Sequence, residues 1–265
     1  MLQSGSPCPH FQRHQLAEVI CQLRFPTILS IDNKEPADFQ EAIRAMFPRY
    51  GVRKEQQPPK LINPGTPNAK LETSAPINNY SFLSADGRWR LNLTRDFIAL
   101  STPVYPGWSR FAAQFDRPLA EFIRIYQPAF FERIALRYLN AFSRAALDLE
   151  HTPWSELFKA PYIGPLAHED VADSAVTQFS QNCEILLGGS CRARIHSGTG
   201  FVKRNIPNAP QDNELKFILD LDISMQGQTE PRLAAAGLET LHHHATSIFV
   251  DAIEPTLREA MQPET

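Results

Sequence analysis

Two patterns of apolar and polar positions occur in the first half of this chain and again, in the same order, in the second half. Alternation of apolar and polar residues, typical of half-buried strands, is found at 15–25, 88–94, 130–142, 191–201 and 215–223. Apolar residues three or four positions apart, typical of one helix face, are found at 108–126 and after Pro231. The order strand, short helix, two or three strands and long helix therefore fills 15–126 and recurs in 130–261.

Turn residues join the central strands of each half into hairpins. Asp86-Gly87 is the favoured dipeptide for a two-residue hairpin turn, and Gly188-Gly189 separates two extended segments in the second half. Strands that are joined by hairpins and apolar on one side form an antiparallel sheet with one solvated face, and the helices must cover the other. The sequence predicts an α+β fold: an antiparallel sheet of two β-α-β-β-β-α pseudo-repeats with two long helices packed on one face. TATA-box-binding-like and helix-grip proteins have this order of elements.

The same pattern divides the chain into three parts. We expect an N-terminal arm at 1–14, a first α+β half at 15–127 and a second at 128–265, with both halves sharing one sheet. Short helices are predicted at 36–47, after Pro36, and at 154–158. Three further segments lack periodicity and are predicted to be loops, the first of them a long surface connection: 53–78, 160–172 and 205–213.

Composition restricts the class of protein. Hydrophobic residues make up 43% and charged residues 21% of the 265 positions, which is ordinary for a soluble globular protein. No apolar run approaches the roughly 18 residues of a membrane span, and Met1–His14 has no signal-like apolar core. A net charge of −3 argues against a general polyanion-coating protein but leaves room for a local basic patch. The cysteines are expected to be reduced, mostly buried residues of a cytoplasmic protein: Cys8, Cys21, Cys183 and Cys191.

Four blocks carry a family resemblance: LAEVICQLRFP (16–26), SADGRWRLNLTRDFIALST (84–102), FFERIALRYLN (130–140) and LHHHATSIFVDAIEPTLREAM (241–261). With these blocks the chain resembles an uncharacterised bacterial family of proteins of about this length, distributed sporadically as if by lateral transfer. The resemblance implies an accessory protein of a mobile-element or defence-related bacterial system. It supplies no catalytic residues.

Arginines on the polar sides of the predicted strands form the first candidate site: Arg88, Arg90, Arg133, Arg137, Arg192 and Arg194. If these strands share a sheet, the guanidinium groups gather on its open face, where they suit phosphate or carboxylate recognition. The alternative is a solvated lattice of surface ion pairs with acidic residues on the same strands, Glu18, Glu132, Asp220 and Asp222. This face lacks aromatic residues in the predicted pattern, which argues against single-stranded nucleic acid.

Histidines offer weaker candidates. Cys8, His10 and His14 have zinc-ligand spacing but lack a fourth ligand, so no metal site is predicted. The run 242–244 is consecutive on a helix, where side chains point about 100° apart, and is expected to be a partly exposed flank. Acid–base groups are also available at 151, 168–170 and 196, but no motif pairs them with a nucleophile.

The remaining aromatic residues are expected to be core, so no cofactor is predicted: Trp108, Phe111, Phe115, Phe122 and Phe249. We therefore expect a non-catalytic binding protein that engages a protein partner through its sheet face or long loops. Nucleic-acid binding by the arginine face and an enzyme with an unrecognised site remain alternatives. A homo-oligomer is compatible with either, and no membrane is expected.

Overall fold

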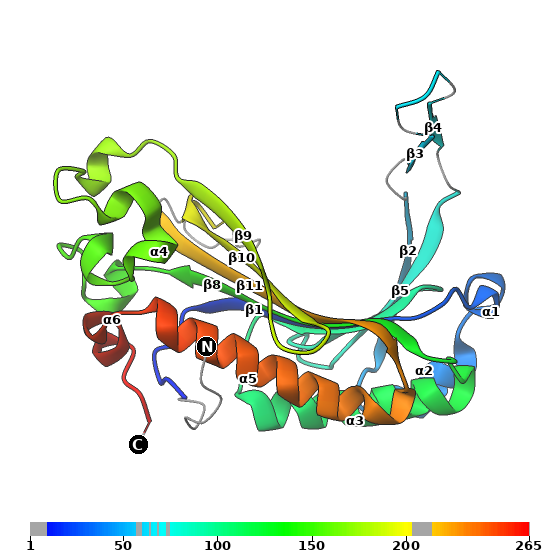
Figure 1. Cartoon of the computed structure of the whole chain (residues 1–265). Helices are drawn as coiled ribbons and strands as arrows, with labels where there is room; N and C mark the ends of the chain where they lie inside the picture. Colours follow the sequence, from blue (N-terminus) through cyan, green and yellow to red (C-terminus); the bar gives the residue numbers. More distant parts are fainter. Residues whose placement is uncertain are drawn as a thin grey trace.

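The computed structural model describes six stretches of the chain, which Figure 1 shows in colour: 10–56, 60–63, 65–67, 69–72, 75–202 and 214–264. Within them, nine strands form one antiparallel sheet, and two short strands form a separate hairpin, β3 (Lys60–Ile62) and β4 (Lys70–Glu72). The sheet order is β2 (Arg49–Glu55), β5 (Ile77–Leu83), β6 (Arg90–Leu93), β7 (Phe97–Thr102), β1 (Leu16–Arg24), β8 (Phe131–Phe142), β11 (Lys216–Thr229), β10 (Cys191–Gly200) and β9 (Ser180–Leu186).

The strand order is the same on both sides of the central β1–β8 pair. Outward from β1 lie β7, β6 and β5, and outward from β8 lie β11, β10 and β9, with β2 added beyond β5. Both halves of the chain thus contribute to one sheet, and the α+β class with an antiparallel open sheet is confirmed.

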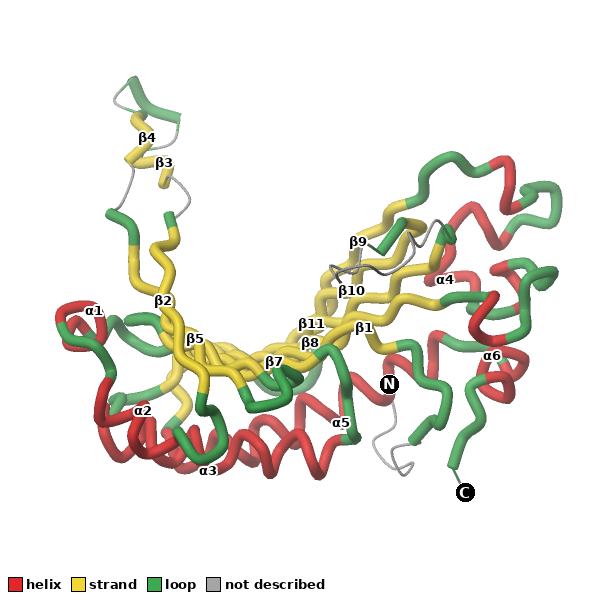
Figure 2. The backbone as a smooth tube through the Cα atoms, turned by 180° about the vertical axis from the view of Figure 1, so that it is seen from behind, coloured by secondary structure: helices red, strands yellow, loops and turns green. Residues whose placement is uncertain are grey.

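Two 19-residue helices, α3 (Trp108–Tyr126) and α5 (Ala234–Ala252), lie along one side of the sheet. Figure 2 shows that the sheet curves like a saddle, so that its other side is concave and uncovered. We call these sides the helix face and the open face. Four short helices lie at the ends of the saddle: α1 (Leu29–Asn33), α2 (Ala37–Ile43), α4 (Ala160–Ile163) and α6 (Pro255–Ala260).

The core lies between the helix face and the two long helices. Alternate strand residues such as Leu23, Leu136 and Leu219 are fully buried there, as the pattern predicted. Phenylalanines fill the space: the ring centroids of Phe25 and Phe122 are 4.7 Å apart. Burial of each such side chain contributes roughly 1.5–3 kcal/mol.

The predicted loop at 53–78 is wrong in part. The strand β2 continues to Glu55 and pairs along its whole length with β5, and the β3–β4 hairpin stands beyond them. We call residues 49–78 the projection. Its strands escaped detection because most side chains of β2 are exposed on both faces, so backbone pairing is not accompanied by apolar alternation.

Other boundaries also differ from the expectation. The predicted loop 160–172 contains α4 and a 3-10 helix at Gly164–Ala167, each opened by a proline. The helix predicted at 36–47 is α2, which ends earlier, at Ile43, and α1 precedes it at Leu29–Asn33, where no helix was predicted. The helix predicted at 154–158 is a 3-10 helix at Trp154–Glu156. The segment 205–213 lies outside the described residues.

The segment at 10–13 is tied to the last described residues of the chain. Arg13 N–H donates to the carbonyl of Met261 at 3.0 Å, and Glu264 N–H donates to the carbonyl of His10 at 2.8 Å. The first and last described residues therefore lie side by side, on the side of the sheet that carries α5 and α6 (Figure 1). Among the described residues, no helix has both the length and the apolar character needed to cross a membrane.

Candidate functional site

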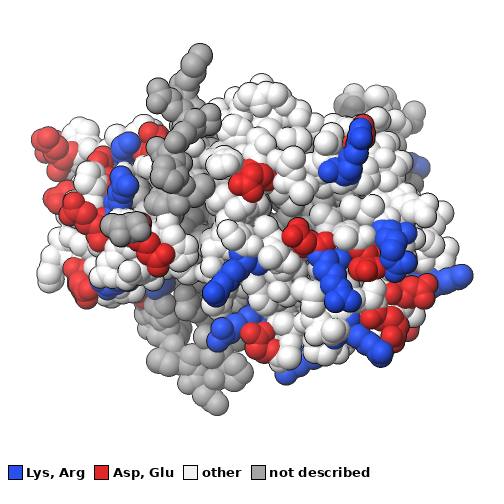
Figure 3. All heavy atoms as spheres, turned by 90° about the horizontal axis from the view of Figure 1, so that it is seen from below, with Lys and Arg blue, Asp and Glu red and all other residues white. Residues whose placement is uncertain are grey.

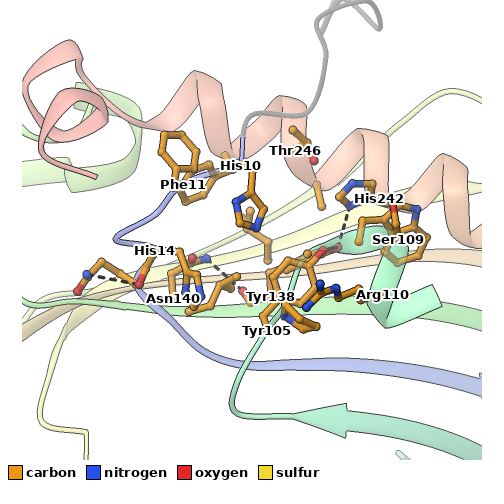
Figure 4. A pocket seen from close by; sticks show the side chains of 18 of the residues that line it. His10, Phe11, His14, Tyr105, Ser109, Arg110, Tyr138, Asn140, His242 and Thr246 are labelled. Carbon is orange, nitrogen blue, oxygen red and sulfur yellow. Dashed lines mark hydrogen bonds between the residues drawn. The ribbon is translucent and has the colours of Figure 1, made fainter. Parts of the chain in front are cut away.

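A pocket of about 600 Å³ opens on the helix face, where α5 meets the N-terminus of α3 and the segment 10–16. Tyr138 and Asn140 of β8 and Leu221 of β11 form its floor. Figure 4 shows that the side chains converge from elements far apart in the sequence. We call this the helix-face pocket.

The glycine before α3 allows the N-terminus of this helix to lie close to the segment that carries His10. Gly107 precedes α3 with a φ of 98°, a conformation that side-chain-bearing residues rarely adopt. A Cβ at this position would also lie 3.3 Å from Nε2 of His10. The small side chains of Ala245 and Thr246 on α5 leave space on the opposite wall.

The polar centre of the pocket is a tyrosine–histidine pair. The Tyr138 hydroxyl and His242 Nδ1 are 2.8 Å apart, and the Tyr105 hydroxyl lies 3.5 Å from that of Tyr138. The Trp108 ring stacks on the His242 imidazole, with centroids 4.5 Å apart and planes at 13°. Trp108 also donates its indole N–H to Glu239 at 2.6 Å. These contacts fix the orientation of the His242 imidazole and of the Trp108 indole.

Burial sets the charge state of His242 in this pair. It lowers the pKa of His242 to about 4, with a smaller lowering by His243, although Glu239 acts in the opposite direction. His242 is therefore neutral at pH 7, and a base this weak is poorly matched to acid–base catalysis near neutrality. Burial also lowers the pKa of His14 on the pocket wall. Ring faces, hydroxyls and the neutral imidazole of His242 thus line much of the cavity, and Glu239 and Arg110 are charged groups on its wall.

This arrangement corrects two expectations from the sequence. Of the three consecutive histidines, His243 is exposed and His244 partly so, as predicted, but His242 is 7% exposed and lies inside the pocket. Trp108 and Phe249, expected in the core, are only partly buried and line the same pocket. The reason for His242 is that consecutive helix residues point about 100° apart, and position 242 lies on the buried side of α5 with Leu238, Leu241 and Ala245.

The other histidine candidates do not form the metal or acid–base groups that their spacing suggested. Cys8 lies outside the described residues, while His10 and His14 line the helix-face pocket. In the described stretches, no group of three His, Cys, Asp or Glu residues could hold a metal ion. His168 is exposed beside Asp170, and His196 lies on the open face, 3.1 Å from the Asn182 side chain.

The structure brings three of the six predicted arginines together on the open face. Arg133, Arg192 and Arg194, joined by Arg24, line a hollow of about 270 Å³ over β1, β8, β11, β10 and β9. We call this the open-face pocket. Sequence analysis missed Arg24 as a site residue, although it lies on the polar side of the first predicted strand, 15–25.

Carboxylates accompany these arginines. Arg133 Nη2 lies 2.8 Å from each oxygen of Asp222, and Glu184 accepts from Arg192 at 2.7 Å and from Arg194 at 3.2 Å. Hydrogen bonds from these two arginines lower the pKa of Glu184. Part of the predicted ion-pair lattice is thus present, with Glu184 as a partner that the pattern did not suggest.

The remaining predicted arginines lie apart from this cluster. Arg137 pairs with Asp220, its Nε 2.8 Å from the carboxylate. Arg90 is exposed on β6, with β7 and β1 between it and β8. The expectation for Arg88 is wrong: β6 begins two residues later, and Arg88 lies in the hairpin connection, 3.7 Å from Asp86.

The side covered by the long helices shows another charge pattern. Figure 3 shows lysines and arginines interspersed with acidic residues over this side, without a large field of one sign among the residues described. Long-range attraction of a polyanion to this side is therefore not expected.

Comparison with known proteins identifies no relative of this chain: no protein-family model matches it, and neither does any curated protein. The bacterial family resemblance of the four sequence blocks stays a prediction.

Proposed function

We propose that this protein is a non-catalytic binding protein that takes a small, flat organic ligand into the helix-face pocket. The observation that carries the proposal is the pocket itself, a cavity of about 600 Å³ walled by aromatic rings around the Tyr138–His242 pair. Ligand sites commonly have about 300–1,000 Å³, mostly apolar walls and a few convergent polar groups.

The chemistry of the walls indicates the kind of ligand. Trp108, Tyr105 and Phe249 offer ring surfaces for a planar apolar body. Tyr138, Asn140 and Thr246 offer neutral hydrogen-bonding groups, and Arg110 can pair with an anionic substituent. We therefore expect an aromatic or heteroaromatic compound with one or two polar substituents.

Two features favour binding over catalysis. The low pKa of His242 makes its imidazole a weak base at neutral pH, and its Nδ1 is already engaged with Tyr138.

Fluorescence titration with 8-anilinonaphthalene-1-sulfonate tests this site. The dye has two aromatic parts and one sulfonate, and we expect saturable binding of one molecule per chain at pH 7. Thr246→Phe places a ring inside the cavity and should weaken binding by about tenfold or more. Thr240→Phe is the matched control, because Thr240 is exposed on the same helix and does not line the pocket.

Two results would contradict the proposal. One is the absence of saturable binding to the wild-type protein. The other is equal binding by the Thr246→Phe variant, provided that its unfolding transition shows a folded protein.

A specific observation favours a second function, the engagement of a protein partner by the projection. Val52 is 51% and Leu71 is 69% exposed there, although both are large apolar residues. Exposed apolar residues on a protruding element mark candidate interaction sites. A cytoplasmic location fits this proposal, since the described cysteines Cys21, Cys183 and Cys191 are free thiols, with Cys183 exposed. A bacterial origin is part of the same proposal and rests on the resemblance of the four sequence blocks.

Affinity purification from the native host tests this second function. A partner recovered in stoichiometric amount with the wild-type protein should be lost from the Val52→Ser, Leu71→Ser double variant. Leu29→Ser is the control, because Leu29 is 62% exposed on α1, outside the projection. Recovery of the same partner with the double variant would exclude the projection as its binding site.

A further inference from the structure

The open-face pocket gathers four arginines on the side of the sheet opposite the helix-face pocket. Five neighbouring strands contribute to it: Arg24 comes from β1, Arg133 from β8, Arg192 and Arg194 from β10, and the other lining residues from these strands, β11 and β9. Side chains of directly paired residues project from the same face of a sheet. The register therefore determines which groups are neighbours.

The register places like charges side by side. Arg24 is directly opposite Arg133 in the β1–β8 pair. On β11, Gln226 is directly opposite Arg133. Ser224, two residues away on the same strand, is directly opposite Arg192. Like charges directly opposite each other on neighbouring strands destabilise a sheet unless a counter-charge lies between them.

The carboxylates nearby do not balance these charges. The hollow has four guanidinium groups but only two carboxylates, Asp222 and Glu184, which leaves a formal charge of +2. Asp222 is occupied by Arg133, and Glu184 by Arg192 and Arg194. Within the described part of the chain, Arg24 forms no ion pair, and Nε of Arg192 is buried without a hydrogen-bond partner.

Polar uncharged groups complete the rim. Gln22, Ser224 and Gln226 line the same hollow and can donate to oxyanions. Beyond the rim, Phe97 on β7 is directly opposite Arg24 and so projects from the open face, contrary to the expectation that this face lacks aromatic residues. Its ring is only partly buried and offers a stacking surface beside the arginines.

We propose that the open-face pocket binds a phosphate group of a small ligand, with Arg24, Arg133 and Arg192 as the principal donors. Guanidinium groups bind phosphate oxygens through paired, charge-assisted hydrogen bonds. A hollow of about 270 Å³ accommodates one phosphate group and part of the molecule that bears it. A dianionic phosphate would neutralise the formal charge of +2 in the hollow. Bound between Arg24 and Arg133, it would also replace the repulsion of their guanidinium groups by attraction to a shared anion.

Isothermal titration calorimetry at constant ionic strength tests this proposal with three probes: inorganic phosphate, adenosine monophosphate and a short single-stranded oligonucleotide. We expect both small probes to bind the wild-type protein, the nucleotide more tightly if its base stacks on Phe97. Arg24→Gln should weaken both by about tenfold to a hundredfold, because it removes a charge-assisted contact. Without phosphate this variant should be at least as stable to urea as the wild type, since a like-charge pair is removed.

Arg90→Gln is the matched control, because Arg90 is exposed on the open face of β6 but does not line the hollow. Its affinities should equal those of the wild type. Failure of both small probes to bind at about 10 mM would overturn the proposal, as would unchanged affinity in the Arg24→Gln variant. Binding of the oligonucleotide alone would replace the phosphate site by an extended nucleic-acid surface. The helix-face pocket is not involved in any of these outcomes.

Discussion

Protonation of the buried histidine in the helix-face pocket should make the stability of this protein depend on pH. Burial lowers the pKa of His242 to about 4 in the folded protein, from a usual value of 6.5. Between these values the unfolded chain binds a proton that the folded protein does not bind. The stabilisation from neutral His242 is therefore complete above pH 6.5 and is lost as the pH falls toward 4.

The magnitude follows from the two pKa values. From pH 7 to pH 5, this residue alone should lower the free energy of unfolding by about 2 kcal/mol. The variant His242→Gln cannot take up the proton but keeps an amide for Tyr138. Urea unfolding at both pH values should show a loss in the wild type that exceeds the loss in the variant by about this amount.

Comparison of two proteins over the same pH interval removes the contributions of other groups, including His14 and His244, whose pKa values are also lowered. His243→Gln is the matched control, because His243 is the exposed neighbour on the same helix. It should lose as much stability as the wild type. Equal losses in the wild type and the His242→Gln variant would refute the reasoning that His242 is buried in neutral form.

Two further changes test the packing. Phe158→Ala should lower the free energy of unfolding in urea by about 3–5 kcal/mol, because Phe158 is fully buried and its ring centroid lies 4.3 Å from that of Phe217. Phe201→Ala is the control: Phe201 is 63% exposed, so its removal should change this free energy by less than about 0.5 kcal/mol. Gly198→Ala should lower the free energy of unfolding by about 1–3 kcal/mol or detach β9, because a Cβ at this position would lie 2.6 Å from the carbonyl oxygen of Phe179. Stability equal to that of the wild type would contradict this close approach.

Elements with a strong apolar pattern could be predicted from the sequence alone. The stripe of Phe111, Phe115 and Phe122 located α3 to its observed bounds, Trp108–Tyr126, because one face of this helix is buried. The alternation in β8 and β10 likewise placed their buried residues. In contrast, β2 pairs at the edge of the sheet with most of its side chains exposed, so its pattern resembled a loop.

The candidate sites were harder to predict, because they depend on contacts between distant residues. Tyr138 and His242 are 104 positions apart, and alternation identifies Tyr138 only as one more residue of the buried face. The alternation of apolar and polar residues along the strands was enough to predict that arginines gather on the open face. It could not distinguish Arg133, which lines the hollow, from Arg137, whose carboxylate partner lies one row further along β11.

The pairing of residues 10–13 with 261–264 has a consequence for synthesis on the ribosome. Strands such as β5, β6 and β7 can pair as they emerge, because their partners are close in sequence, but the carbonyl of His10 must wait until Glu264 has been made. The wall that His10, Phe11 and His14 contribute is thus the final part of the cavity to close. A nascent or truncated chain that lacks residues 255–264 would have all nine strands of the sheet but a cavity with one wall missing, so ligand retention would distinguish chains that contain this segment from chains that lack it.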